Sequence, residues 1–360
     1  MRPAAGFFDR APFILFWETT RACDLECQHC RANAEVDRDP DELTTDEGKA
    51  LLDEARAMGC PVVVLTGGDP AKRPDLVELV AHGKQIGLHV ALTPSATPLV
   101  TPALLEELAE AGLARLAISL DSAVPGGHDG FRGVAGSWTR TFEILKDAKR
   151  LGLTTQVNTS VTPFNQHELE TIAEQVAALE IELWGVFFIV PTGRAADSEL
   201  LDANDVEAIM HRLASIAETA PFDIKTTAAP HYRRVLLERQ VERKEIVGIA
   251  DEIGRAPRSV NDGQGICFVA RNGDIFPSGF LPVHCGNVRE EGLTSTYRDH
   301  PFFQELRDTE ALEGKCGACS FRRVCGGSRA RAYAVHGRAM AEEPACAYVP
   351  RGYQGAVGVG

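Results

Sequence analysis

Short apolar segments alternate with amphipathic ones over the first half of the chain. The apolar segments show no polar alternation, which is typical of parallel strands that are buried on both faces. Between them, apolar residues recur at helical spacing, and the first such segment opens on a Thr-Thr-Asp-Glu capping signature. The predicted strands are 13–17, 61–65, 88–92, 116–120, 155–161 and 185–190, and the predicted helices are 44–58, 76–86, 102–111, 139–151 and 169–179.

Six strand–helix alternations predict an α/β fold in which helices cover a parallel sheet. We expect a partial (β/α)6 barrel over 12–200, a helical connection and linker over 201–262, and a small loop-rich C-terminal domain over 263–350. Within the connection, 204–218 and 232–245 have helical patterns, whereas 251–265 is polar and rich in Gly and Pro. The last residues, 352–360, are expected to fray.

Composition narrows the class of protein. The chain has 360 residues, more than a usual single domain, and 44% of them are hydrophobic, which is enough for a sizeable core. A formal net charge of −14 argues against nucleic-acid binding. The N-terminus lacks the apolar region of a signal peptide, and no stretch is long enough to span a membrane, so we expect a cytoplasmic protein without a membrane partner.

Ten cysteines in a chain without an export signal favour metal ligation over disulfides. Three of them, Cys23, Cys27 and Cys30, form a C-x3-C-x2-C motif directly after the first predicted strand. A structural zinc site needs a fourth ligand, whereas three close cysteines suit a [4Fe–4S] cluster with one open iron. Cys60 stands alone and is interpreted as a small buried hydrophobe.

This motif, with His29 before its last cysteine, and the later turn Thr66-Gly67-Gly68-Asp69 resemble the radical S-adenosylmethionine (SAM) enzymes. In that family the three thiolates hold a [4Fe–4S] cluster, and SAM chelates the open iron. Reduction then cleaves SAM to a 5′-deoxyadenosyl radical, which abstracts a hydrogen atom from the substrate. The cofactor carries out the difficult step, while the protein positions and shields it.

The resemblance also implies a set of SAM-binding residues at the carboxyl ends of the strands. They are Thr66, Gly67, Gly68, Asp69, Ser119, Asp121, Arg132, Asn158 and Val190. Arg132 is expected to pair with the SAM carboxylate, which suits a planar guanidinium. From the residues alone, the Gly-Gly pair could be a simple turn, Ser119 to Asp121 a helix cap or Asx turn, and Asn158 a satisfied core amide. No catalytic acid or base is assigned.

The C-terminal cysteines resemble the SPASM extension of radical SAM enzymes. Cys316, Cys319, Cys325 and Cys346 match the ligands of its outer auxiliary [4Fe–4S] cluster. Cys267 and Cys285 match two of the four inner-cluster ligands, but the other two positions lack cysteine, and Arg329 falls near one of them. A second auxiliary cluster that is absent, smaller or open-sited therefore stands beside the interpretation of these two residues as plain buried thiols.

Three segments, 187–194, 227–234 and 325–333, look most like the tetrapyrrole-modifying subgroup of heme d1 and siroheme-dependent heme synthesis, which acts on propionate side chains. Arginines suit such anions, although for any one of them taken alone a surface ion pair is the favoured interpretation. The arginines in these segments are Arg194, Arg233, Arg234, Arg329 and Arg331. His231 and Tyr232 could serve as proton or axial donors.

Two other functions compete with a tetrapyrrole substrate. Many SPASM enzymes crosslink, epimerise or decarboxylate ribosomal peptides, often with an additional leader-binding domain, and none fits ahead of a first strand near residue 12. An iron–sulfur electron carrier would need neither a barrel nor an open iron. For the enzyme, we expect a flavodoxin- or ferredoxin-type electron donor.

Overall fold

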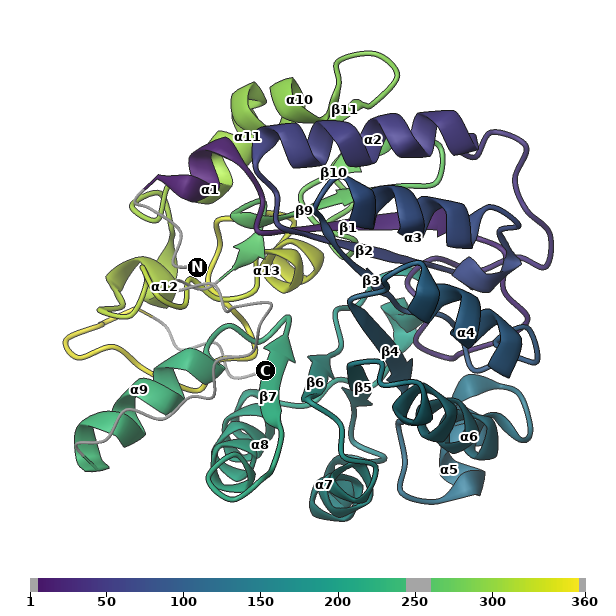
Figure 1. The fold of residues 1–360 in the computed structure, drawn as a ribbon. Helices are drawn as coiled ribbons and strands as arrows, with labels where there is room; N and C mark the ends of the chain where they lie inside the picture. Colours follow the sequence, from purple (N-terminus) through teal and green to yellow (C-terminus); the bar gives the residue numbers. More distant parts are fainter. Residues whose placement is uncertain (1–5, 244–259, 356–360) are drawn as a thin grey trace.

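The computed structural model describes residues 6–243 and 260–355. Strands and helices alternate along most of it, and the helices lie outside a curved sheet (Figure 1). The strands are β1 (Ile14–Thr20), β2 (Val62–Gly67), β3 (His89–Leu92), β4 (Arg115–Ser119), β5 (Thr155–Val161), β6 (Leu183–Phe188), β7 (Asp223–Thr227), β8 (Asn261–Asp262), β9 (Gly265–Val269), β10 (Asp274–Phe276) and β11 (Gly286–Asn287).

The helices comprise longer ones around the sheet and short ones in the C-terminal part. They are α1 (Phe7–Arg10), α2 (Thr45–Met58), α3 (Leu76–Gln85), α4 (Pro102–Glu110), α5 (Pro125–Arg132), α6 (Ser137–Arg150), α7 (Leu169–Ala178), α8 (Ala203–Ile216), α9 (Tyr232–Arg243), α10 (Leu293–Asp299), α11 (Pro301–Arg307), α12 (Gly314–Ala318) and α13 (Arg329–His336), with 3-10 turns η1 (Pro70–Lys72), η2 (Gln166–Glu168) and η3 (Gly193–Asp197).

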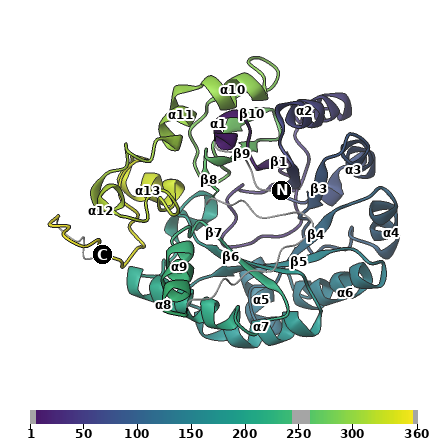
Figure 2. The ribbon, with the colours of Figure 1, turned by 60° about the vertical axis from the view of Figure 1, so that its left-hand side comes forward.

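One sheet holds the molecule together, in the order β11-β10-β9-β1-β2-β3-β4-β5-β6-β7, with β8 beside β9. Strands β1 to β7 are parallel, and Figure 2 shows them curling while α2, α3, α4, α6, α7 and α8 ring them. The predicted partial barrel is confirmed. Strand β7 was not predicted, because Asp223 and Lys225 break its apolar run where they face away from the helices.

Side chains alternate between the two faces of the sheet. On β4, Leu116 and Ile118 join the main core under the helices, so Ser119 lies on the opposite, inner face. In the strand register, Ser119 lies beside Asn158 on β5, and Asn158 lies beside Gly185 on β6. The inner face therefore carries the polar residues, and the carboxyl ends of the strands open at one edge.

The C-terminal part continues the same sheet, because β9 pairs in parallel with β1. It also covers the end of β6 through a second apolar cluster that includes Val190, Leu281 and Leu312. The boundary expected at residue 263 thus falls inside a continuous sheet. Of the linker expected over 251–265, residues 251–259 lie outside the described residues, as do 244–245 of the predicted helix and 356–360 of the tail.

The capping signature at the start of α2 is real. The Thr44 hydroxyl accepts from the Glu47 amide, and the Glu47 carboxylate accepts from the Thr44 amide.

Within the described residues, no helix is both long and apolar enough to cross a membrane.

Packing at Gly48 gives a test of the fold. A Cβ at this buried position in α2 would overlap the ring of Trp17, which is 0% exposed. Gly48→Ala should therefore lower the free energy of unfolding by about 1–3 kcal/mol, measured by anaerobic chemical denaturation. Gly126→Ala in α5 meets no atom within 4 Å and is the matched control. Equal stability of the two variants would contradict this packing.

Candidate active site

The loop that follows β1 brings the first three cysteines together. Cys23 and Cys27 are buried in one small cluster, and Cys30 packs against them. The loop is bonded to the turn after β2, because the Gly68 amide donates to the Thr20 carbonyl at 2.8 Å and the Asp69 amide donates to the Ala22 carbonyl at 2.7 Å. The end of β2 thus sets where the cysteines lie.

Only glycine fits at this contact. Gly67 has φ of 143°, and a Cβ there would overlap the Thr20 carbonyl oxygen. A Cβ at Gly68 would overlap the carbonyl oxygens of Arg21 and Ala22. The glycine pair is therefore required for the close approach of β2 to the cysteine loop, whichever ligand its backbone also meets.

Asp69 holds the next strand end in place. Its carboxylate is 0% exposed and accepts from the Ser95 amide at 3.2 Å and the Thr97 hydroxyl at 2.7 Å. It also accepts from the Ala71 amide at 3.1 Å. Burial raises its pKa, which these hydrogen bonds oppose. The Asp69 side chain therefore has a positioning role, and Ser95, whose hydroxyl lies 3.3 Å from the Cys23 sulfur, is a site residue that the sequence did not indicate.

Two arginines lie beside the thiols. Arg132 donates to the Asp121 carboxylate at 2.6 Å and to the Cys27 sulfur at 3.7 Å. Burial works against ionisation of Asp121, yet the Arg132 charge holds the pKa of that carboxyl below its usual value. Burial likewise raises the pKa of the Cys27 thiol, and Arg132 opposes it. Arg132 thus lies at the site, paired here with Asp121.

The second arginine, Arg194, comes from η3 after β6. Its amide donates to the Cys30 carbonyl at 2.9 Å. Burial alone would raise the pKa of the Cys30 thiol, but hydrogen bonds from the Arg194 side chain and the backbone amides of Ala32 and Ala34 outweigh it and hold this pKa below its usual value. The buried Nε and Nη2 of Arg194 have no partner among the described residues.

His29 lies between these charges. Its ring stacks on Phe131 with centroids 4.2 Å apart and planes 6° apart. Burial, helped by the neighbouring Arg132, lowers its pKa to about 3, so the ring is neutral at pH 7. Its buried Nδ1 also lacks a partner in the described part of the chain.

These observations fit a cluster with a carboxylate-bearing ligand. Three thiols on one loop leave one position of a [4Fe–4S] cluster open. Two guanidiniums beside them favour anionic groups, and unpartnered buried N–H groups on Arg194 require an acceptor to avoid a desolvation penalty.

The remaining predicted SAM residues lie around the same strand ends. The Asn158 side-chain oxygen accepts from the Gln156 side-chain amide at 2.6 Å. A Cβ at Gly185 would crowd the same oxygen, so its hydrogen bond and its packing both lie within the sheet. The Ser119 carbonyl accepts from Thr141 at 3.0 Å, and Thr66 accepts from Thr19 at 3.2 Å. Val190 is 3% exposed under the C-terminal cluster.

An ion pair next to the motif was not expected from the sequence. Arg31 bonds the Glu18 carboxylate at 3.0 Å, and its guanidinium lies 4.5 Å from the centroid of the Phe268 ring. Glu18 is 2% exposed on β1. A carboxylate inside an otherwise apolar strand was the available sign of this pair, because such a charge is rarely buried without a partner.

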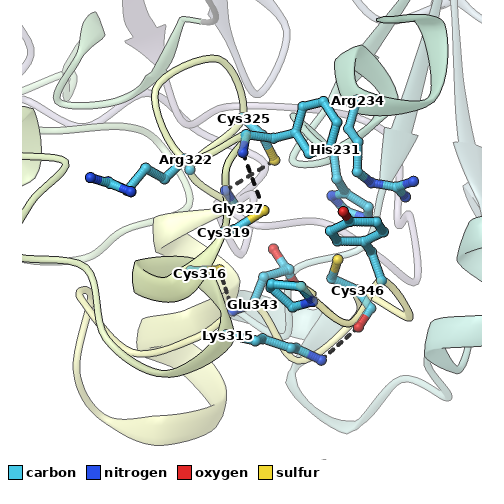
Figure 3. Close-up of a pocket in the computed structure, with 14 residues that line it drawn as sticks. His231, Arg234, Lys315, Cys316, Cys319, Arg322, Cys325, Gly327, Glu343 and Cys346 are labelled. Carbon is cyan, nitrogen blue, oxygen red and sulfur yellow. Dashed lines mark hydrogen bonds between the residues drawn. The ribbon is translucent and has the colours of Figure 1, made fainter. Parts of the chain in front are cut away.

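The four C-terminal cysteines line one hollow (Figure 3). Each sulfur faces a backbone amide: Cys316 accepts from Glu343 at 3.2 Å, Cys319 from Phe321 at 3.4 Å and Cys325 from Gly327 at 3.4 Å, while the Tyr348 amide donates to Cys346. Four thiols with oriented amide donors fit a [4Fe–4S] cluster fully ligated by cysteine.

Two buried arginines, Arg329 and Arg331, bond residues that line this hollow. Arg329, 2% exposed, donates to the carbonyls of Ala339 and Ala341 at 2.7 Å and to the Cys316 sulfur at 3.8 Å. Arg331 pairs with Glu343 at 3.1 Å and donates to the Ile189 carbonyl at the end of β6 at 3.2 Å. Arg331 therefore connects the cysteine hollow to the strand end beside Val190.

Cys267 and Cys285 do not line the C-terminal hollow. Both pack in the main core, where Cys60 also lies. Their thiols donate to the carbonyls of Phe276 at 3.8 Å and Val283 at 3.3 Å. Burial raises the pKa of Cys285 to about 12 and that of Cys267 well above its usual value. Both thiols thus donate to backbone carbonyls inside the apolar core, as the interpretation of plain buried thiols predicts.

Comparison with known proteins agrees with this site. Residues 17–176 match the family model of the Radical SAM superfamily. An AdoMet-dependent heme synthase of Methanosarcina barkeri is 38% identical over 94% of this chain and 97% of its own length, and one of Nitratidesulfovibrio vulgaris is 37% identical over 94% and 93%. Streptococcus suis SuiB bound to S-adenosylmethionine shares the fold, with a TM-score of 0.75 and 17% identity over 94% of this chain and 78% of that one.

The chain belongs to the radical SAM superfamily. It is a SAM-dependent enzyme, and its cofactors are a [4Fe–4S] cluster and S-adenosylmethionine. The resemblance to SPASM-type enzymes stated from the cysteine pattern is confirmed.

The cysteine loop can be tested by removing its thiols. The triple variant Cys23→Ala, Cys27→Ala, Cys30→Ala should lose reductive SAM cleavage while retaining about four irons per chain in the C-terminal hollow. Iron analysis and chromatography of 5′-deoxyadenosine measure both quantities. Continued 5′-deoxyadenosine formation, or complete loss of iron, would refute the division into two separate cysteine centres.

The burial of His128 predicts that the folded protein loses stability as the pH falls. Its Nδ1 accepts from the Asp121 amide at 3.0 Å, and burial lowers its pKa to about 4. An unfolded histidine binds its proton near pH 6.5, so His128 removes up to about 3 kcal/mol of stability as pH falls from 6.5 to 4. His128→Asn, whose amide oxygen can accept the same bond, should flatten the pH dependence of urea denaturation over that window. An unchanged slope would contradict this role.

Proposed function

We propose that this enzyme makes heme by decarboxylating propionate side chains of an iron tetrapyrrole. The observation that carries the proposal is identity of 37–38% to AdoMet-dependent heme synthases along 94% of the chain. A PqqA peptide cyclase of Rhodopseudomonas palustris is less similar, at 31%. The bound cluster and SAM would supply a 5′-deoxyadenosyl radical that takes one hydrogen atom from the substrate.

The conversion of a propionate to a vinyl group requires an electron acceptor. Removing one hydrogen atom from the methylene next to the ring leaves a carbon radical. When the C–C bond to the carboxylate breaks, CO2 leaves, the vinyl double bond forms, and one electron must depart. We assign Cys23, Cys27 and Cys30 to the SAM cluster and Cys316, Cys319, Cys325 and Cys346 to an auxiliary [4Fe–4S] cluster that accepts this electron.

The C-terminal hollow is suited to this role because of its connection to the barrel. Arg331 joins Glu343 at the hollow to the Ile189 carbonyl at the end of β6. The neighbouring η3 carries Arg194, which contacts the cysteine loop. The two proposed centres therefore share one structural element, β6 with its following turn.

Arg194 is the arginine best suited to hold a substrate carboxylate. Its buried Nε and Nη2 lack partners among the residues that the structure describes. By contrast, Arg234 is engaged by Glu207 and Glu238, and Arg329 and Arg331 are committed inside the C-terminal part. Tyr232 packs in the main core, so its hydroxyl does not suit an axial donor.

A flavodoxin- or ferredoxin-type protein is the proposed reductant, in a reducing cytoplasm that keeps the cysteines available for clusters. We retain 12–200, 201–262 and 263–350 as the functional division into barrel, connection and auxiliary-cluster region, although the sheet crosses the last boundary.

Anaerobic turnover with an iron tetrapyrrole tests the proposal. Reconstituted enzyme, SAM, a reductant and coproheme should yield products that have lost CO2 and two hydrogens per propionic acid group, seen by mass spectrometry. One hydrogen leaves as the abstracted atom and the other as the carboxyl proton. Didecarboxysiroheme serves as the second tetrapyrrole probe. Active SAM cleavage without binding or change of either tetrapyrrole would refute the substrate class and favour a peptide substrate.

Arg194→Gln should weaken coproheme binding about tenfold or more, because a charge-assisted hydrogen bond contributes about 1.5–3 kcal/mol. The Kd for SAM, compared at equal iron content, should not change. Arg289→Gln, which removes a surface pair with Glu47 at 2.7 Å, is the control and should alter neither affinity. Weakened SAM binding with unaltered coproheme affinity would reassign Arg194 to the cofactor.

A further inference from the structure

His231 extends from the segment that follows β7 into the wall of the C-terminal hollow. It lies between β7 and α9, and it lines the hollow together with the four cysteines (Figure 3). The first of these cysteines, Cys316, follows His231 by more than 80 residues in the chain. His231 is therefore a point at which the connection expected over 201–262 meets the auxiliary-cluster site.

The turn before His231 is held in a costly conformation. Ala228 has φ of 55°, a left-handed value that costs a non-glycine residue roughly 1–2 kcal/mol. The turn is also fixed by the Thr226 hydroxyl, which donates to the Ala229 carbonyl at 2.9 Å. Strain of this kind persists where the surrounding structure over-determines a position, and it is common at functional sites.

The His231 ring is buried without a hydrogen-bond partner. The residue is 1% exposed, and neither Nδ1 nor Nε2 is bonded within the described part of the chain. An unsatisfied buried polar group costs about 1–3 kcal/mol, so native proteins rarely keep one without a ligand. The hollow that the ring lines is the place from which such a ligand can approach.

The charged neighbours of His231 are already committed. Glu343 accepts from Arg331 at 3.1 Å, from the Ser328 amide at 2.6 Å and from the Ala345 amide at 3.0 Å. Arg234 is held by Glu207 and Glu238. None of these groups uses the imidazole, which leaves the contents of the hollow as its partner.

We propose that His231 donates an N–H hydrogen bond to a sulfur of the auxiliary cluster and thereby raises the reduction potential of that cluster. The inference rests on the auxiliary-cluster assignment of the proposed function and is independent of the tetrapyrrole substrate. An imidazole ring carries at least one N–H whether it is neutral or protonated, so His231 can donate to a sulfur.

The direction of the effect follows from charge. Reduction adds an electron to the cluster, and a donor to its sulfurs stabilises the more negative state. The amide donors to the thiols come from the C-terminal segment itself, whereas His231 comes from the connection after β7. Through His231, a segment outside the cysteine-rich region thus tunes the potential of the electron acceptor.

The potential of the auxiliary cluster is the readout. It is measured by an EPR-monitored redox titration in full-length protein with Cys23, Cys27 and Cys30 replaced by Ala, which isolates this cluster. His231→Phe should shift the potential to more negative values with iron content unchanged. His231→Gln, which keeps an N–H donor, should stay closer to the parent.

Tyr232→Phe is the matched control. Its hydroxyl is also buried and unpartnered in the described structure, but it does not line the hollow, so the potential should not move. A His231→Phe protein with full iron and the parent potential would overturn the proposal.

Iron content distinguishes a missing auxiliary cluster from a cluster whose potential does not depend on His231. If the parent of this titration binds no iron, the auxiliary assignment fails and the proposal fails with it, whatever the substrate. If His231→Phe and His231→Gln both lose iron while Tyr232→Phe keeps it, His231 is an iron ligand and the hydrogen-bond role is refuted.

Discussion

The active site depends on the close contact between the turn after β2 and the chain that leaves β1. Gly67 and Gly68 allow the two backbones to approach until a single Cβ would overlap a carbonyl oxygen. Two short backbone hydrogen bonds, at 2.8 and 2.7 Å, then fix the cysteine loop to the sheet. Because backbone hydrogen bonds hold the loop, its attachment to the sheet does not depend on long flexible side chains.

Two positively charged side chains lie beside the cysteine loop. Arg132 and Arg194 approach the thiols from different elements, and each counters the burial that would otherwise keep a thiol protonated. A cluster requires thiolates, so these arginines favour its binding. The C-terminal hollow uses a related solution, with backbone amides on its sulfurs and Arg329 beside Cys316.

The sequence predicted the barrel strands β1 to β6 and the cysteine centres because both leave local patterns. Apolar runs mark buried parallel strands, and cysteine spacing marks a cluster loop. Strand β7 escaped because its inner face is polar. Ser95 and the Glu18–Arg31 pair escaped because their roles arise only when distant segments meet. Arg329 and Arg331 looked available for anions, but folding commits them to carbonyls and Glu343.

The central claim is that a SAM-derived radical takes hydrogen from a propionate side chain of an iron tetrapyrrole. Coproheme deuterated at the propionate methylene next to the ring, incubated with reduced enzyme and SAM, tests it most directly. If the radical takes this hydrogen, the 5′-deoxyadenosine will carry one deuterium, in step with vinyl formation. Unlabelled 5′-deoxyadenosine alongside vinyl product would contradict it.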